Sequence, residues 1–130
     1  MNYFNISFLL IVLSTWLTAI LLFLKSRENK SIIMWGWLCI AVSIWGLGGL
    51  IATTTLIEEK AFWGWQIANI GTITIPIVFY HFVYTYCNLR SKFLLFSLYC
   101  IATVFLIINF FIKDLYFSKV RLAFNEFYYI

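Results

Sequence analysis

The chain has 130 residues, of which 64% are hydrophobic and only 11% carry a formal charge. Soluble domains average about 25% charged residues. The composition therefore excludes an ordinary soluble domain and indicates an all-α, polytopic membrane protein. The net charge of +4 fits loops that face an anionic membrane surface, and the sequence has no basic tract of the kind that binds nucleic acid.

Four apolar runs are long enough to span a bilayer as helices. Thr55 and Glu58 have the spacing of a capping box, which predicts that the third helix starts near Leu56. We expect one transmembrane helical domain over residues 1–130, with an amphipathic C-terminal segment after four spans at residues 4–24, 32–53, 56–89 and 93–112.

Basic residues concentrate on one side of the predicted membrane. The loop between the second and third spans carries one basic residue, Lys60, beside two glutamates. The other two loops carry one glutamate and the basic residues Lys25, Arg27, Lys30, Arg90 and Lys92. Because an excess of lysine and arginine marks cytoplasmic loops, we expect a multi-pass protein of the cell membrane with its N-terminus outside.

The second span carries a set of small residues after a mid-helix tryptophan. Gly48 and Ala52 are four residues apart, a spacing that lets two helices approach closely. We therefore expect Trp45, Gly48 and Ala52 to pack against another helix. The alternative is that the glycines have no such role, because glycine is common in spanning helices.

The third span holds the residues with the most functional promise. Residues 61–89 contain no Asp, Glu, Lys or Arg, and as a helix they would be roughly 43 Å long. At about 100° per residue, the polar side chains fall within one arc of roughly 100°. This polar stripe is a candidate ligand or coupling face, since a polar face in a bilayer needs protein or water. It comprises Gln66, Thr74, His81, Tyr84, Thr85 and Asn88.

The only histidine and the only proline of the chain lie in this span. His81 is either a neutral side chain bonded to a neighbouring helix, or a ligand contact or protonation switch. Pro76 is either a tolerated packing kink or a hinge. One histidine without a carboxylate in the spans supports no catalytic triad, and the cysteines lack metal-ligand spacing. We therefore expect no enzyme activity, no metal and no cofactor.

The third span also carries a familiar pattern. Gly71, Pro76 and the pair His81-Phe82 follow an aromatic start at residues 62–65, and the second span holds Trp45-Gly-Leu-Gly. Over residues 31–86 this resembles the N-terminal seven-helix membrane sensor region of bacterial histidine kinases. The resemblance implies a signal-input region truncated after about four helices, the first part of a larger sensor domain. Its expected partners are an unknown small ligand and either the missing helices or a second copy.

Two other functions stay open. A small structural or assembly protein would bind other membrane subunits through the glycine face of the second span. A transporter fragment would line a substrate site with its proline-interrupted third helix. The absence of intramembrane charge argues against ion-coupled transport. In each case the lipid bilayer is the surrounding partner.

Overall fold

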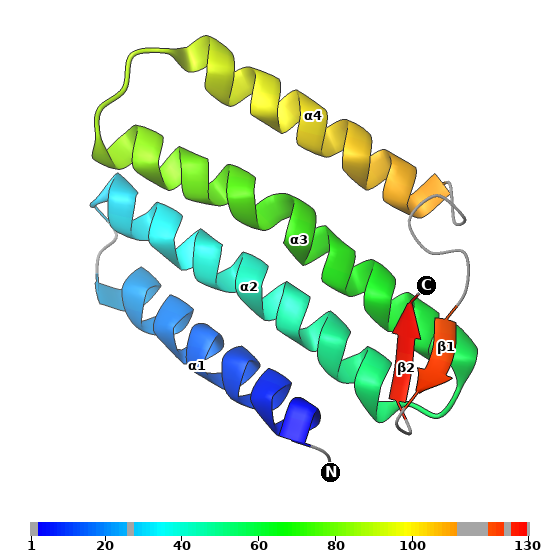
Figure 1. Cartoon of the computed structure of the whole chain (residues 1–130). Coiled ribbons are helices and arrows are strands. Elements are labelled where there is room, and N and C mark those ends of the chain that lie inside the picture. The colour runs from blue at the N-terminus through cyan, green and yellow to red at the C-terminus, as the bar shows by residue number, and fades with distance from the viewer. Residues whose placement is uncertain (1–2, 26–27, 112–119, 124–125, 130) are drawn as a thin grey trace.

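The computed structural model describes residues 3–25, 28–111, 120–123 and 126–129. Each helix in this part of the chain is long and apolar enough to cross a membrane, which confirms the all-α class and the four spans. The helices are α1 (Tyr3–Lys25), α2 (Lys30–Thr54), α3 (Glu58–Tyr86) and α4 (Lys92–Phe111) (Figure 1).

The four helices lie side by side in chain order, with successive helices running in opposite directions (Figure 1). Among the described residues, helix–helix contacts join only α1 to α2, α2 to α3 and α3 to α4. The helices therefore form an open row, one helix thick, and not a closed bundle. Helix α2 contributes the largest share of the core, with ten buried residues against six in α3, three in α1 and two in α4.

The start of α3 differs from the prediction. The helix begins at Glu58 and not near Leu56, and no side chain caps it. The expected capping box is wrong because Thr55 closes α2 in an extended conformation, and its Oγ1 accepts a hydrogen bond from the Ile57 N–H at 3.2 Å. Glu58 and Glu59 still occupy the first turn, where the helix dipole favours acidic residues.

Helix α3 ends at Tyr86, three residues before the predicted end. Asn88 follows with φ of 51°, in the left-handed region that asparagine tolerates. The N–H of Leu89 donates to the carbonyl oxygen of Tyr84 at 3.0 Å, and the N–H of Asn88 donates to that of Thr85 at 3.4 Å. This is a Schellman termination, which satisfies the last carbonyls of the helix.

A small hairpin follows the helices. Strands β1 (Val120–Ala123) and β2 (Glu126–Tyr129) pair antiparallel, and both lie against α3, with β2 also against α2. They belong to the segment predicted to be amphipathic, so this part of the chain adds two short strands to the helical fold. Residues 112–119, 124–125 and 130 of that segment lie outside the described residues, and its amphipathic character stays a prediction.

Candidate functional site

Helices α2 and α3 touch through their backbones. A Cβ built on Gly48 of α2 would lie 2.6 Å from the carbonyl oxygen of Gly64 and would overlap the backbone of Ala68. A Cβ on Gly64 of α3 would lie 2.6 Å from the backbone nitrogen of Ala52, which is fully buried. Any larger side chain at these glycines would push the two helices apart.

Trp45 of α2 packs against both neighbouring helices, α1 and α3. Its Cβ would be 2.6 Å from a Cβ placed on Gly71 of α3, and its ring meets the ring of Phe8 in α1 edge-on at 5.5 Å. Thr15 of α1 and Ser43 of α2 add a hydrogen bond of 2.6 Å between their hydroxyl oxygens. Helices α1, α2 and α3 therefore form one tightly packed block, and the glycine face of α2 is occupied within the chain.

Helix α4 is held to this block differently, through side chains near two separated points. At the first point three amides meet, and we call Gln66, Asn69 and Asn109 the amide cluster. The Nδ2 of Asn69 donates to Oδ1 of Asn109 at 2.8 Å. Asn109 is only 1% exposed. Its backbone carbonyl accepts a hydrogen bond from the Gln66 Nε2 at 3.2 Å, and its Nδ2 donates to the backbone carbonyl of Gln66 at 3.3 Å.

The amide cluster contains one acceptor without a hydrogen bond. The Oε1 of Gln66 is buried and has no partner among the described residues. Its Nε2 faces the carbonyl oxygen of Asn109, so exchanging the two ends of the amide would place two acceptors against each other. A buried unpaired acceptor costs free energy, which weakens this attachment of α4.

The second attachment point joins the other half of α3 to α4. The Nδ1 of His81 lies 2.7 Å from the hydroxyl oxygen of Tyr99, and the two rings are perpendicular with centroids 5.8 Å apart. Tyr84 meets the His81 ring edge-on at a centroid distance of 6.4 Å. His81 is therefore hydrogen-bonded to a neighbouring helix.

An open cavity of about 420 Å³ separates the two attachment points along the α3–α4 interface. Helix α3 stays helical through Pro76, which lines this cavity together with Thr72. Because proline has no N–H, the carbonyl of Thr72 lacks its ordinary helical donor. The other walls come from Asn69, Ile73, Ile77, Leu98, Ile101, Ala102 and Phe105.

The predicted polar stripe does not form one continuous site. Gln66 and His81 both reach α4, whereas the hydroxyls of Thr74 and Thr85 bond to carbonyls of their own helix at 2.8 and 2.9 Å. Asn88 lies beyond the helix end, where it serves the termination. The helical wheel treated all six side chains alike, but hydroxyls can be satisfied within one helix and long amides or imidazoles cannot.

Three residues that complete the two attachment points are not among the site residues predicted from the sequence: Asn69, Tyr99 and Asn109. Asn69 follows Gln66 by three positions, a spacing that places both side chains on the same helix face. Asn109 is one of two buried residues in α4, the other being Ala102. In the sequence, the signal for this partner was a strongly polar residue, Asn109, within a long apolar run.

Among the described residues, no group of three or more His, Cys, Asp or Glu side chains is arranged to hold a metal ion. Comparison with models of protein families, with curated proteins and with solved structures finds no match for this chain.

Proposed function

We propose that this chain is a membrane-embedded signal-input region of the type that precedes the catalytic part of a bacterial histidine kinase. The observation that best supports this function is the difference between the helix interfaces of the chain. Helices α2 and α3 touch backbone to backbone at their glycines, and side chains of α1 pack onto glycines of α2. Helix α4 is instead attached by hydrogen bonds of side chains on either side of a cavity. On this proposal the signal is a shift of α4 against the block formed by α1, α2 and α3.

The energies suit such a shift. Hydrogen bonds between spanning helices contribute on average about 0.6 kcal/mol and at most about 1.7 kcal/mol each. A ligand shifts an equilibrium only by its differential affinity for the two states. Because α4 is attached by only a few such bonds, a ligand needs only a modest difference in affinity between the two positions of α4 to shift the helix from one to the other. The cavity beside Pro76 is the proposed place for a small ligand, and Pro76 the proposed hinge.

The open row supports the expectation of further helical partners. A row one helix thick leaves both faces of α4 without a neighbour from the described part of the chain, and most of its large apolar side chains are exposed. We propose that additional helices or a second copy pack there, with lipid covering the rest. The basic loops favour an N-terminus outside the cell.

The alternatives receive less support. An assembly protein was expected to bind subunits through the glycine face of α2, but this face lies against α3 of the same chain. A transporter fragment would need polar or charged groups lining a path. The walls of the α3–α4 cavity include one amide, Asn69, among mainly apolar side chains. We also propose that the chain itself has no catalytic activity.

Signalling output gives the functional test. His81→Leu removes the Tyr99 hydrogen bond, while Phe79→Leu alters an exposed residue of the same helix as a matched control. Both variants would be compared with wild type at equal membrane abundance, using a transcriptional reporter of the pathway that the chain controls. We expect His81→Leu to change output and Phe79→Leu to leave it near wild type. Equal output from all three proteins would contradict the proposal.

A further inference from the structure

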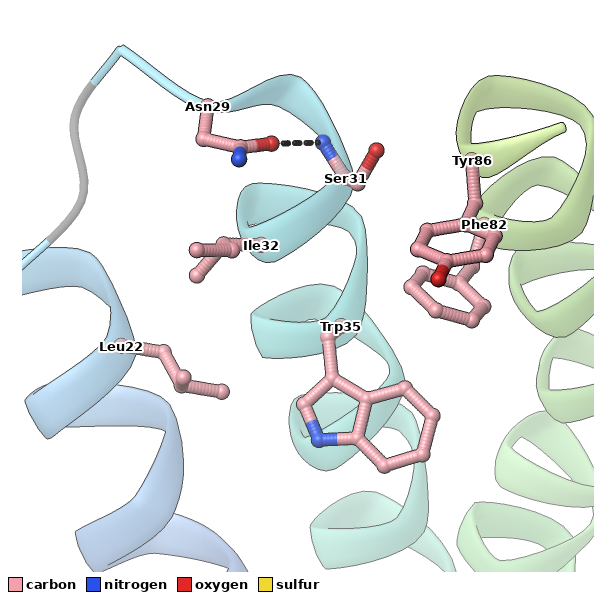
Figure 2. Close-up of a pocket in the computed structure, with 7 residues that line it drawn as sticks. All are labelled: Leu22, Asn29, Ser31, Ile32, Trp35, Phe82 and Tyr86. Carbon is pink, nitrogen blue, oxygen red and sulfur yellow. Dashed lines mark hydrogen bonds between the residues drawn. The ribbon is translucent and has the colours of Figure 1, made fainter. Parts of the chain in front are cut away.

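A second cavity, of about 670 Å³, lies at the end of the row where α1 finishes and α2 begins. Figure 2 shows side chains from three helices around it: Leu22 from α1, Ile32 and Trp35 from α2, and Phe82 from α3. The Trp35 and Phe82 rings meet edge-on at 5.1 Å, which fixes one wall. These four side chains are apolar, so the cavity offers a surface that suits hydrocarbon.

The mouth of this cavity is polar. Asn29 caps α2 through its Oδ1, which accepts from the Ser31 N–H at 3.0 Å (Figure 2). Asn29 also carries an amide nitrogen and Ser31 a hydroxyl, and both residues line the cavity. Both groups can donate a hydrogen bond to an oxygen at the mouth. The cavity is thus apolar at the end that points toward the membrane interior, and hydrogen-bond donors lie at its mouth.

Positive charge is concentrated at the end of the row where this mouth lies. Lys25 ends α1 three residues after Leu22, and Lys30 stands between Asn29 and Ser31; both lysines are exposed. Arg90, in the loop after α3, and Lys92, the first residue of α4, are exposed at the same end of the row. Glu28 is the one carboxylate in the described loops of this end. The local charge therefore favours an anion over a cation or a neutral group.

We propose that this cavity binds one anionic phospholipid, with its acyl chain along Trp35 and Phe82 and its phosphate at Asn29 and Ser31 between Lys25 and Lys30. A soluble anion would leave the apolar wall uncovered. A neutral lipid would gain little from the lysines. The cavity volume falls within the range of about 300–1,000 Å³ typical of ligand sites. This inference does not depend on the signalling proposal, because it uses neither the α3–α4 interface nor the His81–Tyr99 pair.

Native mass spectrometry of the full chain, released from detergent micelles, tests the proposal. The probes are phosphatidylglycerol and phosphatidylcholine with identical acyl chains, supplied in equal amounts. We expect preferential retention of one phosphatidylglycerol. Since a lysine near a membrane surface contributes about 1 kcal/mol, Lys25→Gln and Lys30→Gln should each weaken retention roughly five-fold. Lys60→Gln removes the same charge at the opposite end of the row and should change retention little.

A second pair of variants tests the apolar part of the site. Ile32→Trp fills the cavity and should reduce retention of both lipids, whereas Leu13→Trp adds the same bulk on an exposed position of α1 and should not. Equal retention of the two lipids by wild type would overturn the proposal. So would equal losses from Lys30→Gln and Lys60→Gln, or unchanged retention in Ile32→Trp. The lysine variants alter exposed side chains and keep the test valid if Ile32→Trp does not fold.

Discussion

The Nδ1 of His81 lies 2.7 Å from the hydroxyl oxygen of Tyr99, and this pair attaches the second half of α3 to α4. The two groups come from helices that the chain connects by a short loop, yet they sit well inside the spans, 5 residues before the end of α3 and 7 residues after the start of α4. The chain's only histidine therefore has a defined partner, and replacing either residue removes a hydrogen bond between α3 and α4.

Tyr99→Phe keeps the aromatic ring and removes the hydroxyl that bonds His81. We expect the free energy of unfolding to fall by about 0.6 kcal/mol and by no more than about 1.7 kcal/mol, the range measured for hydrogen bonds between spanning helices. Denaturant titration in mixed micelles measures this. Ser97→Ala is the control, because Ser97 bonds only to the Phe93 carbonyl of its own helix. Equal losses in the two variants would show that the His81 bond contributes nothing between helices.

Asn109→Leu should cost more than Tyr99→Phe. It removes the side-chain bonds to Asn69 and to the Gln66 carbonyl, and it leaves the half-buried Asn69 amide without this partner. An unsatisfied buried polar group costs about 1–3 kcal/mol. The same titration measures the change. Thr103→Val serves as the control, since Thr103 is exposed and bonds only within α4. A loss no greater than that of the control would contradict the role given to the amide cluster.

The four helices could be predicted from the sequence because hydropathy and charge suffice to mark spans. Observed ends differ from the expected ones by at most three residues, and local hydrogen bonds at Thr55 and Asn88 account for the differences at the two ends of α3. The pairing of His81 with Tyr99 could not be predicted. It depends on the relative rotation and depth of α3 and α4, which no periodicity within a single helix encodes.

Gly48→Ala tests the close contact between α2 and α3. The added methyl would overlap the backbone of Ala68, which cannot move without separating the helices. We expect a destabilisation of about 1–3 kcal/mol, typical of overpacking. Gly36→Ala is the matched control on the same helix, because its methyl would meet only the tip of the Phe23 ring at 2.9 Å, and a ring can rotate away. Equal effects would argue against a backbone contact at Gly48.

Orientation in the membrane can be read from a native thiol. Cys87 is exposed at the end of α3, beside the basic residues Arg90 and Lys92. With Cys39 and Cys100 replaced by alanine, we expect a membrane-impermeant thiol reagent to leave Cys87 unlabelled in intact cells and to label it after permeabilisation. A further variant with Cys87→Ala and Thr54→Cys should be labelled in intact cells. The reverse pattern would place the N-terminus inside.

Pulsed electron paramagnetic resonance in lipid nanodiscs tests most directly whether α4 moves against the block formed by α1, α2 and α3. In a cysteine-free background, one pair of spin labels at Ile51 and Phe79 reports on α2 against α3, and a second pair at Phe79 and Ile107 reports on α3 against α4. All three positions are exposed. We expect a narrow distance distribution for the first pair and a broader one for the second. His81→Leu should broaden the distribution of the second pair further and leave that of the first pair unchanged. Equal widths for both pairs, unchanged by His81→Leu, would contradict the account.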